Sequence, residues 1–173
     1  MSETFRFRTW HAAAFLAAIG AVSAVSSSRD ARSYWRGLKR SSKAPPPWVF
    51  PSVWTALNVI QLWADLRILN DREAPDRKAL VGLRATSWLL SAVATPTLFR
   101  NRSLAGAEAA TLAEGVATGA AVALLARRDP LAAAALTPLA LWTAYASLTG
   151  GDEAGAVSNP DKLVDRLRWE GAF

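Results

Sequence analysis

Residues 34–61 read YWRGLKRSSKAPPPWVFPSVWTALNVIQ, and this stretch decides the fold. A basic segment with aromatic residues runs into three consecutive prolines, and an apolar run follows with Trp48 and Trp54 near its start. Proline is tolerated in the first turn of a helix, where its missing N–H would have no partner anyway. Tryptophan is favoured where water meets hydrocarbon. The stretch therefore predicts the start of a transmembrane helix.

Five apolar runs of this kind follow one another, and each approaches the ~20 residues that cross ~30 Å of hydrocarbon. They lie at about residues 10–28, 47–66, 79–99, 104–126 and 131–150, and a polar tail covers 151–173. The alternation typical of strands is absent from the sequence. We therefore predict an all-α fold, an integral membrane bundle of five transmembrane helices, as one domain over residues 1–173. Residues 161–169 are predicted to form a short surface helix.

Two alternatives accompany this prediction. Glu108 and Glu114 inside the fourth run favour a soluble, Ala-rich helical bundle, because an acid at mid-bilayer is costly. Arg6 and Arg8 before the first run are typical of a cleaved signal peptide. We prefer a retained first helix, because four more apolar runs follow and need it for packing.

Composition limits the chemistry. The 173 residues include no cysteine and one histidine, His11, which excludes disulfides, thiolate chemistry, histidine-based metal clusters and His-dependent triads. The net charge is +6, but the basic residues flank apolar runs, which suits anionic lipid better than nucleic acid. We expect membrane lipid as a partner, no nucleic acid and no required cofactor.

The first loop predicts the orientation. Short basic loops near the first helices tend to stay in the cytoplasm. The basic residues of this loop are Arg29, Arg32, Arg36, Lys39, Arg40 and Lys43. We therefore predict a cytoplasmic first loop and C-terminus and an external N-terminus. The Ala- and Arg-rich composition indicates a bacterial source, and we therefore expect the protein in the bacterial cell membrane.

Proline, aromatic and a few small or apolar residues recur at fixed spacings in the first loop and in three of the predicted helices. They are Tyr34, Trp35, Leu38, Pro45, Pro46, Trp48, Trp54 and Leu57, then Pro96 and Phe99, then Pro138, Trp142, Tyr145 and Ala146. With these spacings, nearly the whole chain resembles the TspO/MBR family, the tryptophan-rich sensory proteins and translocator (peripheral benzodiazepine receptor) proteins. The resemblance implies five membrane helices around a flat hydrophobic ligand, a tetrapyrrole such as porphyrin first and a sterol-like lipid next.

The resemblance also implies a pocket between the first, second, third and fifth helices, beneath the first loop. Trp54 and Trp142 align with tryptophans that family members are thought to use around a tetrapyrrole, and indole offers a wide apolar face for stacking. The alternative is that both only pack. The implied wall is Ala24, Phe50, Pro51, Val53, Trp54, Ser87, Ser91, Trp142 and Ala146. Where the family has Gln and Asn in the third helix, this chain has the shorter Ser87 and Ser91.

The first loop is placed to cap this pocket. Four of its basic residues are candidates for contact with porphyrin propionates by charge-assisted hydrogen bonds. The alternative, which we prefer for each one singly, is an anchor to anionic lipid. These residues are Arg32, Arg36, Lys39 and Arg40.

A polar stripe marks one face of the second helix. Trp54, Asn58, Gln61 and Asp65 recur at helical spacing and must face other helices or a cavity if the helix lies in lipid. For Asn58 and Gln61 we favour hydrogen bonds between helices. Asp65, near the helix end, is placed to reach the interface beside Arg67.

The fourth helix carries two acids and a pair of glycines. Glu108 and Glu114 are candidate functional residues, since intramembrane acids are often functional. Their alternatives are a neutral carboxyl bonded to a neighbouring helix or a pair with Arg84. Gly115 and Gly119 form a G-x-x-x-G spacing, which serves packing inside a bundle or a homodimer face.

Three functions fit these observations. The first is a membrane protein that binds a hydrophobic small molecule, with a receptor-like transport or stress-sensing role. The second is a membrane enzyme on the same scaffold, acting on a porphyrin or an apolar isoprenoid lipid through Glu108 or Glu114. The third is a structural subunit that has lost ligand binding. The sequence offers no nucleophile–base pair, so we place the enzyme below the binding protein.

Overall fold

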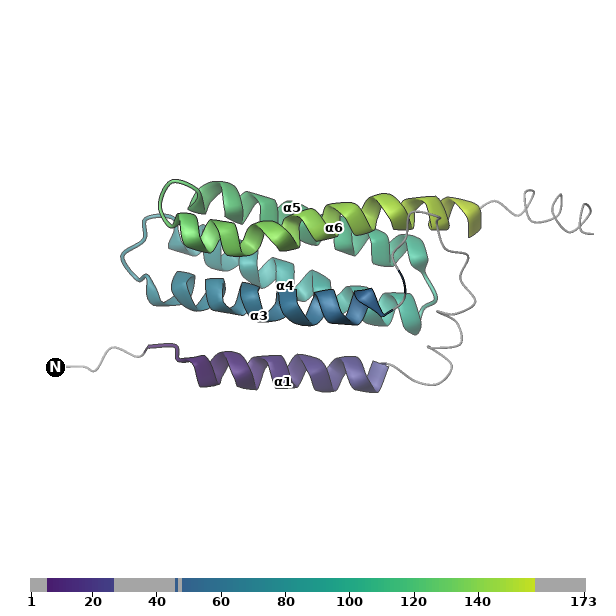
Figure 1. The fold of residues 1–173 in the computed structure, drawn as a ribbon, viewed down its shortest axis with the longest axis horizontal. Coiled ribbons are helices and arrows are strands. Elements are labelled where there is room, and N and C mark those ends of the chain that lie inside the picture. Colours follow the sequence, from purple (N-terminus) through teal and green to yellow (C-terminus); the bar gives the residue numbers. More distant parts are fainter. Residues whose placement is uncertain (1–5, 27–45, 47, 158–173) are drawn as a thin grey trace, which may run out of the picture.

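The structure, a computed structural model, describes residues 6–26, 46 and 48–157, without the side chains of 22–26 and 149–157. The described residues form helices and no strand, as Figure 1 shows. These are α1 (Thr9–Ser26), α3 (Val49–Asn70), α4 (Arg77–Phe99), α5 (Leu104–Leu125) and α6 (Pro130–Val157). The all-α prediction is confirmed, and α6 continues past its predicted end at residue 150. Arg32, Arg36, Lys39, Arg40 and the predicted helix at 161–169 lie outside the described residues.

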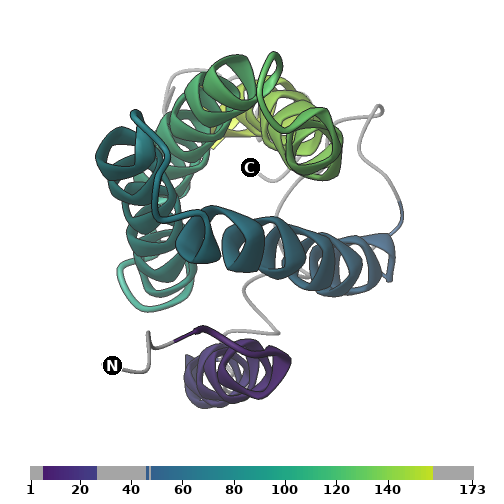
Figure 2. The ribbon, with the colours of Figure 1, turned by 90° about the vertical axis from the view of Figure 1, so that its left-hand side faces the viewer.

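The helices are arranged around a common interior (Figure 2). α4, α5 and α6 pack side by side in chain order, and α3 closes the arrangement against α6 and α4. Short connections at 71–76, 100–103 and 126–129 make consecutive helices antiparallel. α1 lies on the outer side of α3 and also contacts α4. The interior is therefore lined chiefly by α3, α4, α5 and α6.

Specific contacts attach α1 to the rest of the bundle. The Phe7 N–H donates to Asn70 Oδ1 at 2.9 Å, and Asn70 Nδ2 donates back to the Phe7 carbonyl at 2.8 Å. Further along α1, the Phe15 ring meets the Trp88 ring of α4 edge-on, with centroids 4.9 Å apart. α1 is thus tied to the end of α3 and to the middle of α4.

Side-chain caps define the starts of two helices. Ser103 Oγ accepts a hydrogen bond from the Gly106 N–H at 3.1 Å at the start of α5. Asp129 Oδ1 accepts from the Ala132 N–H at 3.1 Å at the start of α6, where Pro130 is the first helical residue. Both caps satisfy N–H groups that a helix end leaves without a partner.

The core uses small side chains, which let helices approach closely. Ala64, Ala121 and Ala132 are fully buried in it. At Gly115 a Cβ atom would lie 2.6 Å from the Thr143 hydroxyl, so glycine is required for the contact between α5 and α6. A Cβ at Gly119 would meet nothing within 4 Å. Gly115 therefore serves packing within the bundle.

Along the helices, large apolar side chains are exposed while the side chains of Gln61, Asp65, Arg84 and Glu114 are buried, which is the pattern expected in lipid. Large apolar residues on the outside include Leu89, Val116, Leu141 and Leu148. By length and hydropathy alone, two helices could span a membrane, Leu104–Leu125 and Pro130–Leu148, and the described apolar part of α1, Thr9–Ala21, is shorter. α3 and α4 carry buried polar residues, and these lower the mean hydropathy although they do not face the lipid.

Candidate functional site

Aromatic residues from α3 and α6 meet at one end of the bundle. The Phe50 and Trp142 rings pack edge to face with centroids 5.6 Å apart, and Tyr145 lies 5.7 Å from Trp142. Trp142 Nε1 is buried and has no hydrogen-bond partner among the described residues. A buried indole N–H usually has one, because leaving it unpaired costs free energy. We call Phe50, Trp142 and Tyr145 the aromatic end.

The other predicted wall residues lie in several environments. Three are half-buried, namely Val53, Trp54 and Ala146. Trp54 follows Phe50 by one turn of α3, and Ala146 follows Trp142 by one turn of α6, so each shares a helix face with its partner. Pro51 is exposed. Ala24 lies in α1, and its side chain is outside the described part of the chain.

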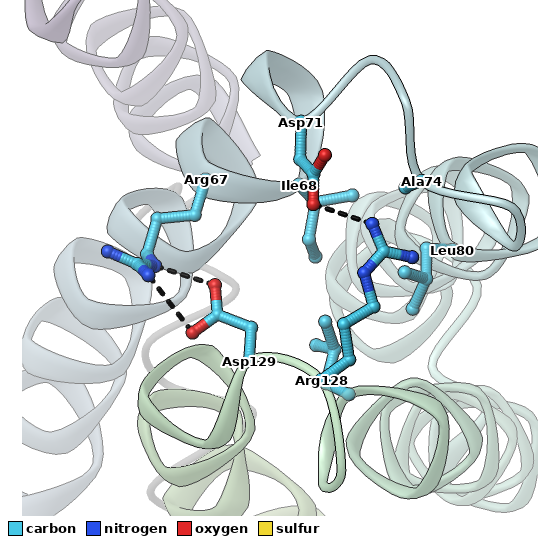
Figure 3. Close-up of a pocket in the computed structure, with 8 residues that line it drawn as sticks. Arg67, Ile68, Asp71, Ala74, Leu80, Arg128 and Asp129 are labelled. Carbon is cyan, nitrogen blue, oxygen red and sulfur yellow. Dashed lines mark hydrogen bonds and ion pairs between the residues drawn. The ribbon is translucent and has the colours of Figure 1, made fainter.

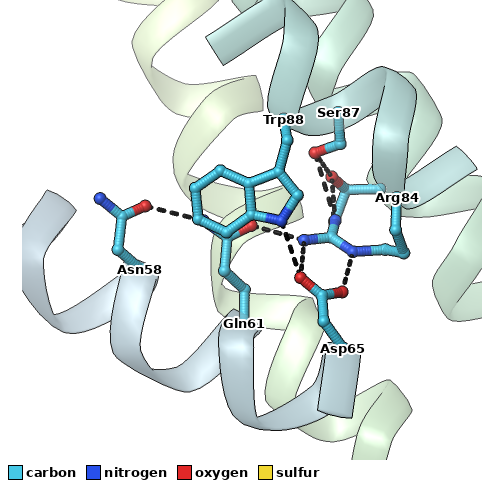
Figure 4. Close-up of polar contacts among 7 residues, drawn as sticks. Asn58, Gln61, Asp65, Arg84, Ser87 and Trp88 are labelled. Atoms are coloured by element: carbon cyan, nitrogen blue, oxygen red, sulfur yellow. Dashed lines mark hydrogen bonds and ion pairs between the residues drawn. The ribbon is translucent and has the colours of Figure 1, made fainter. Parts of the chain in front are cut away.

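Ser87 lies in a buried polar cluster that joins three helices (Figure 4). Arg84 Nε donates to Asp65 Oδ1 at 2.6 Å, and Arg84 Nη2 donates to Gln61 Oε1 at 2.5 Å. Arg84 Nη1 donates to Ser87 Oγ at 3.2 Å and, more weakly, to Thr118 Oγ1 at 3.4 Å. The cluster thereby connects α3 with α4 and α5.

Two further bonds complete this group. Trp88 Nε1 donates to the second oxygen of Asp65 at 2.8 Å, and Gln61 Nε2 donates to Asn58 Oδ1 at 2.8 Å. Arg84 is only 3% exposed and Asp65 only 8%. A charge pair this deeply buried is tolerated because its lone pairs and protons are satisfied. We call Asn58, Gln61, Asp65, Arg84, Ser87, Trp88 and Thr118 the Arg84 cluster.

The cluster decides two of the sequence predictions. Gln61 does bond to a neighbouring helix, through Arg84, so the prediction is confirmed for Gln61, whereas Asn58 accepts its bond from Gln61 of the same helix. The prediction that Asp65 reaches the interface beside Arg67 is wrong, because Asp65 turns inward to Arg84. Arg67 pairs with Asp129 instead. Helical spacing predicts which face of α3 carries Asp65. The identity of its partner depends on how α3 and α4 are each rotated about their axes.

The candidate acids of α5 differ in their surroundings. Glu114 is 1% exposed, Arg84 and Ser91 act on its carboxyl, and its Oε1 has no hydrogen-bond partner among the described residues. Ser91, the other predicted wall residue of α4, is half-buried. Glu108 is half-buried nearer the start of α5. Both acids therefore belong to the interior side of α5, and Glu114 lies deeper.

Ion pairs hold the opposite end of the bundle, around a small surface pocket (Figure 3). Arg67 donates to both oxygens of Asp129, at 2.7 and 3.1 Å. Arg128 pairs with Asp71 at 2.5 Å and also with Asp76. We call these five residues the ion-pair end. The pocket is lined by Arg67, Ile68, Asp71, Ala74, Leu80, Leu125, Arg128 and Asp129, and so excludes both Trp54 and Trp142.

The bonds at this end change the acidity of Asp129. The hydrogen bond from Arg67 lowers the pKa of the Asp129 carboxyl below its ordinary value, and the Ala132 N–H acts in the same direction. Each charge lining the pocket has an opposite charge beside it. The pocket therefore lies between the α3–α4 and α5–α6 connections, and the charged residues that line it offer no unpaired charge to a ligand.

Comparison with known protein families identifies the family of this chain. The model of the TspO/MBR family matches residues 12–151, which include α3, α4 and α5 and most of α1 and α6. The chain belongs to the TspO/MBR family. The resemblance read from the proline and tryptophan spacings is thus confirmed. A search of curated proteins found no match.

Membership of the TspO/MBR family establishes the general class. The chain is an integral membrane helical bundle with five helices in its described part, and its class is that of membrane proteins of the ligand-binding or transport type. Two of its helices are apolar enough to span a membrane by composition alone, in keeping with this class. Among the described residues, no group of three or more potential metal ligands comes together.

Sequence reasoning missed the central role of Arg84. It considered Arg84 only as a partner of Glu114, and it gave no role to Trp88 or Thr118. A signal was present, since an arginine inside an apolar run requires an acceptor within reach. Ser87 and Trp88 follow Arg84 by three and four residues, so all three share a helix face.

Proposed function

We propose that this TspO/MBR protein binds a flat hydrophobic ligand at the aromatic end, with tetrapyrroles as the first class and sterol-like lipids as the second. The observation that carries the proposal is the Trp142 N–H, which is buried beside Phe50 and has no partner among the described residues. A carboxylate or carbonyl on the ligand would accept this hydrogen bond. The indole and phenyl rings would pack against the flat ring system.

Neighbouring residues support the same location. Trp54 extends the aromatic surface by one turn along α3, and Ala146 is a small residue one turn beyond Trp142. The hydroxyl of Ser87 is bonded to Arg84 and Thr118 in the Arg84 cluster, so the aromatic end itself is a mostly apolar site with few polar groups. We propose transport or stress sensing as the downstream role, with the first loop and the C-terminus in the cytoplasm.

The test is a titration of the full chain in lipid nanodiscs with protoporphyrin IX, followed by porphyrin absorbance. Trp142→Phe removes the N–H and part of the stacking surface, so we expect the Kd to rise about tenfold. Trp63→Phe is the matched control, because Trp63 lies on α3, is 45% exposed and contacts Arg67 rather than the aromatic end. We expect its Kd to equal that of the unchanged protein.

One observation favours a structural subunit as the second candidate. Phe50 already packs against Trp142, so the two rings stabilise the contact between α3 and α6 without a ligand. In that case the unchanged protein would show no saturable porphyrin binding in the micromolar range. Equal Kd values for Trp142→Phe and Trp63→Phe would likewise contradict binding at the aromatic end.

A further inference from the structure

The interior around the Arg84 cluster contains more carboxyl groups than cationic groups. Among the described residues Arg84 is the one cation there, whereas Asp65 and Glu114 are two carboxyls, and all three side chains are buried. With every group ionised, this part of the interior would carry a net charge of −1. A buried charge without a counter-charge costs several kcal/mol in a membrane bundle. One positive charge is therefore needed to balance the group.

Arg84 does not supply that charge to Glu114. Its Nε donates to one oxygen of Asp65 at 2.6 Å, and its Nη2 approaches the other at 3.4 Å. The remaining donors reach Gln61, Ser87 and Thr118. The positive charge of Arg84 is thus neutralised by Asp65.

Glu114 is left with a carboxyl oxygen that nothing satisfies. Oε1 is buried and has no hydrogen-bond partner among the described residues. Among the described residues, Arg84 is the cation that acts on this carboxyl. A proton is the smallest positive charge that fits an enclosed site, and protonation removes the excess charge without moving a helix.

We propose that Glu114 is a proton-binding site of the folded bundle, which takes one proton from water and carries it as a neutral carboxylic acid. If Glu114 lost this proton, its carboxylate would become a second negative charge that attracts Arg84. The weak contact from Arg84 Nη1 to Thr118, one turn after Glu114 on α5, marks the direction in which the guanidinium would turn. The proton therefore decides whether Arg84 bonds α3 through Asp65 or α5 through Glu114.

The titratable neighbours of Glu114 are few. From α4 it faces Arg84, and beyond Arg84 lies Asp65 of α3. α5 itself carries Glu108, six residues earlier. On α6, Tyr145 is the titratable residue within 130–148, and it packs against Trp142. The linkage between pH and stability at this site should therefore reflect Glu114 itself.

The experiment measures unfolding of the ligand-free full chain in mixed micelles as a function of pH. Above pH ~5 an exposed glutamate is ionised, so the unfolded chain lacks the proton that the folded chain holds. Stability must then fall as pH rises, and the unfolding constant should increase by up to about tenfold per pH unit from this site. Glu114→Gln, which has the shape of the protonated acid, should remove this component. Glu108→Gln is the control and should retain it.

The outcomes separate the proposal from its alternatives. If Glu114→Gln fails to fold while Glu108→Gln folds, the ionised carboxylate is needed and the proposal is wrong. If the two variants show the same pH dependence, Glu114 carries no proton. Replacing sodium by choline at constant ionic strength tests a metal cation as the occupant, and a stability that follows sodium rather than pH would overturn the proton assignment.

Infrared spectroscopy of the unchanged protein gives a measurement that needs no variant to fold. We expect a carboxylic-acid C=O band at neutral pH that shifts in D₂O, and its absence would contradict the proposal. Porphyrin takes no part in the unfolding or infrared experiments. A negative result in them therefore leaves the ligand proposal standing, and a negative porphyrin titration leaves the Glu114 proposal standing.

Discussion

The two ends of the helix bundle are held together by different interactions. At the ion-pair end, Arg67 and Arg128 bond to aspartates on neighbouring connections, and the Arg84 cluster lies further inside. At the aromatic end, Phe50 and Trp142 meet through rings, and the Trp142 N–H has no partner among the described residues. A buried polar group that finds no partner costs about 1–3 kcal/mol. The difference separates an end that is held by paired charges from an end that is held by apolar rings, where the proposed ligand would supply the missing acceptor.

The largest effect is expected from breaking the buried pair. Arg84→Met leaves the Asp65 carboxylate buried without its counter-charge and should lower the unfolding free energy by about 3–5 kcal/mol. Arg84→Met with Asp65→Leu removes both charges and should recover most of that loss. Unfolding in mixed micelles measures each value.

The ion-pair end provides the control for this prediction. Arg67→Met breaks a pair whose arginine is 41% exposed, so the loss should stay below about 1 kcal/mol. A double variant no more stable than Arg84→Met alone would mean that the cluster stabilises through packing and not through charge.

An intermediate effect compares two tryptophans directly. Trp88 and Trp142 lose similar volume on substitution by Phe, but among the described residues the Trp88 N–H has a partner, Asp65 at 2.8 Å, and the Trp142 N–H has none. Trp88→Phe should therefore be less stable than Trp142→Phe by about 1–2 kcal/mol in the absence of ligand. Thermal unfolding of both variants in one lipid composition measures the difference. Equal stabilities would remove the distinction between the two ends.

The smallest effect concerns pH at the ion-pair end. The lowered pKa of Asp129 means that its ion pair stabilises the fold above the ordinary aspartate range and is lost as pH falls through the folded value. Asp129→Asn keeps an oxygen to cap Ala132 but removes the charge, and should cost less than about 1 kcal/mol at pH 7. Thermal unfolding should show this difference shrinking toward pH 3. If the stability difference persisted at pH 3, the loss would come from the helix cap and not from the ion pair.

The helices could be predicted because their signals are local. The prolines and Trp48 before α3 and the charged breaks between apolar runs need no knowledge of the fold. The inward polar face of α3 could be predicted for the same reason, since helical spacing alone places Gln61 and Asp65 together. Helical period, turn chemistry and hydrocarbon length therefore determine the fold class of this protein.

Partner identity was decided only by the tertiary structure. Asp65 and Arg84 are separated by a connection and by about one to two helix turns on each side, and the sequence does not state how far each helix is rotated about its axis. The same holds for Gly115, whose need for close approach comes from Thr143 on another helix. The sequence by itself determined that Gln61 and Asp65 share one face of α3, because helical spacing depends on one helix at a time. The tertiary structure decided which of them bond, because a hydrogen bond depends on the relative rotation and height of two helices.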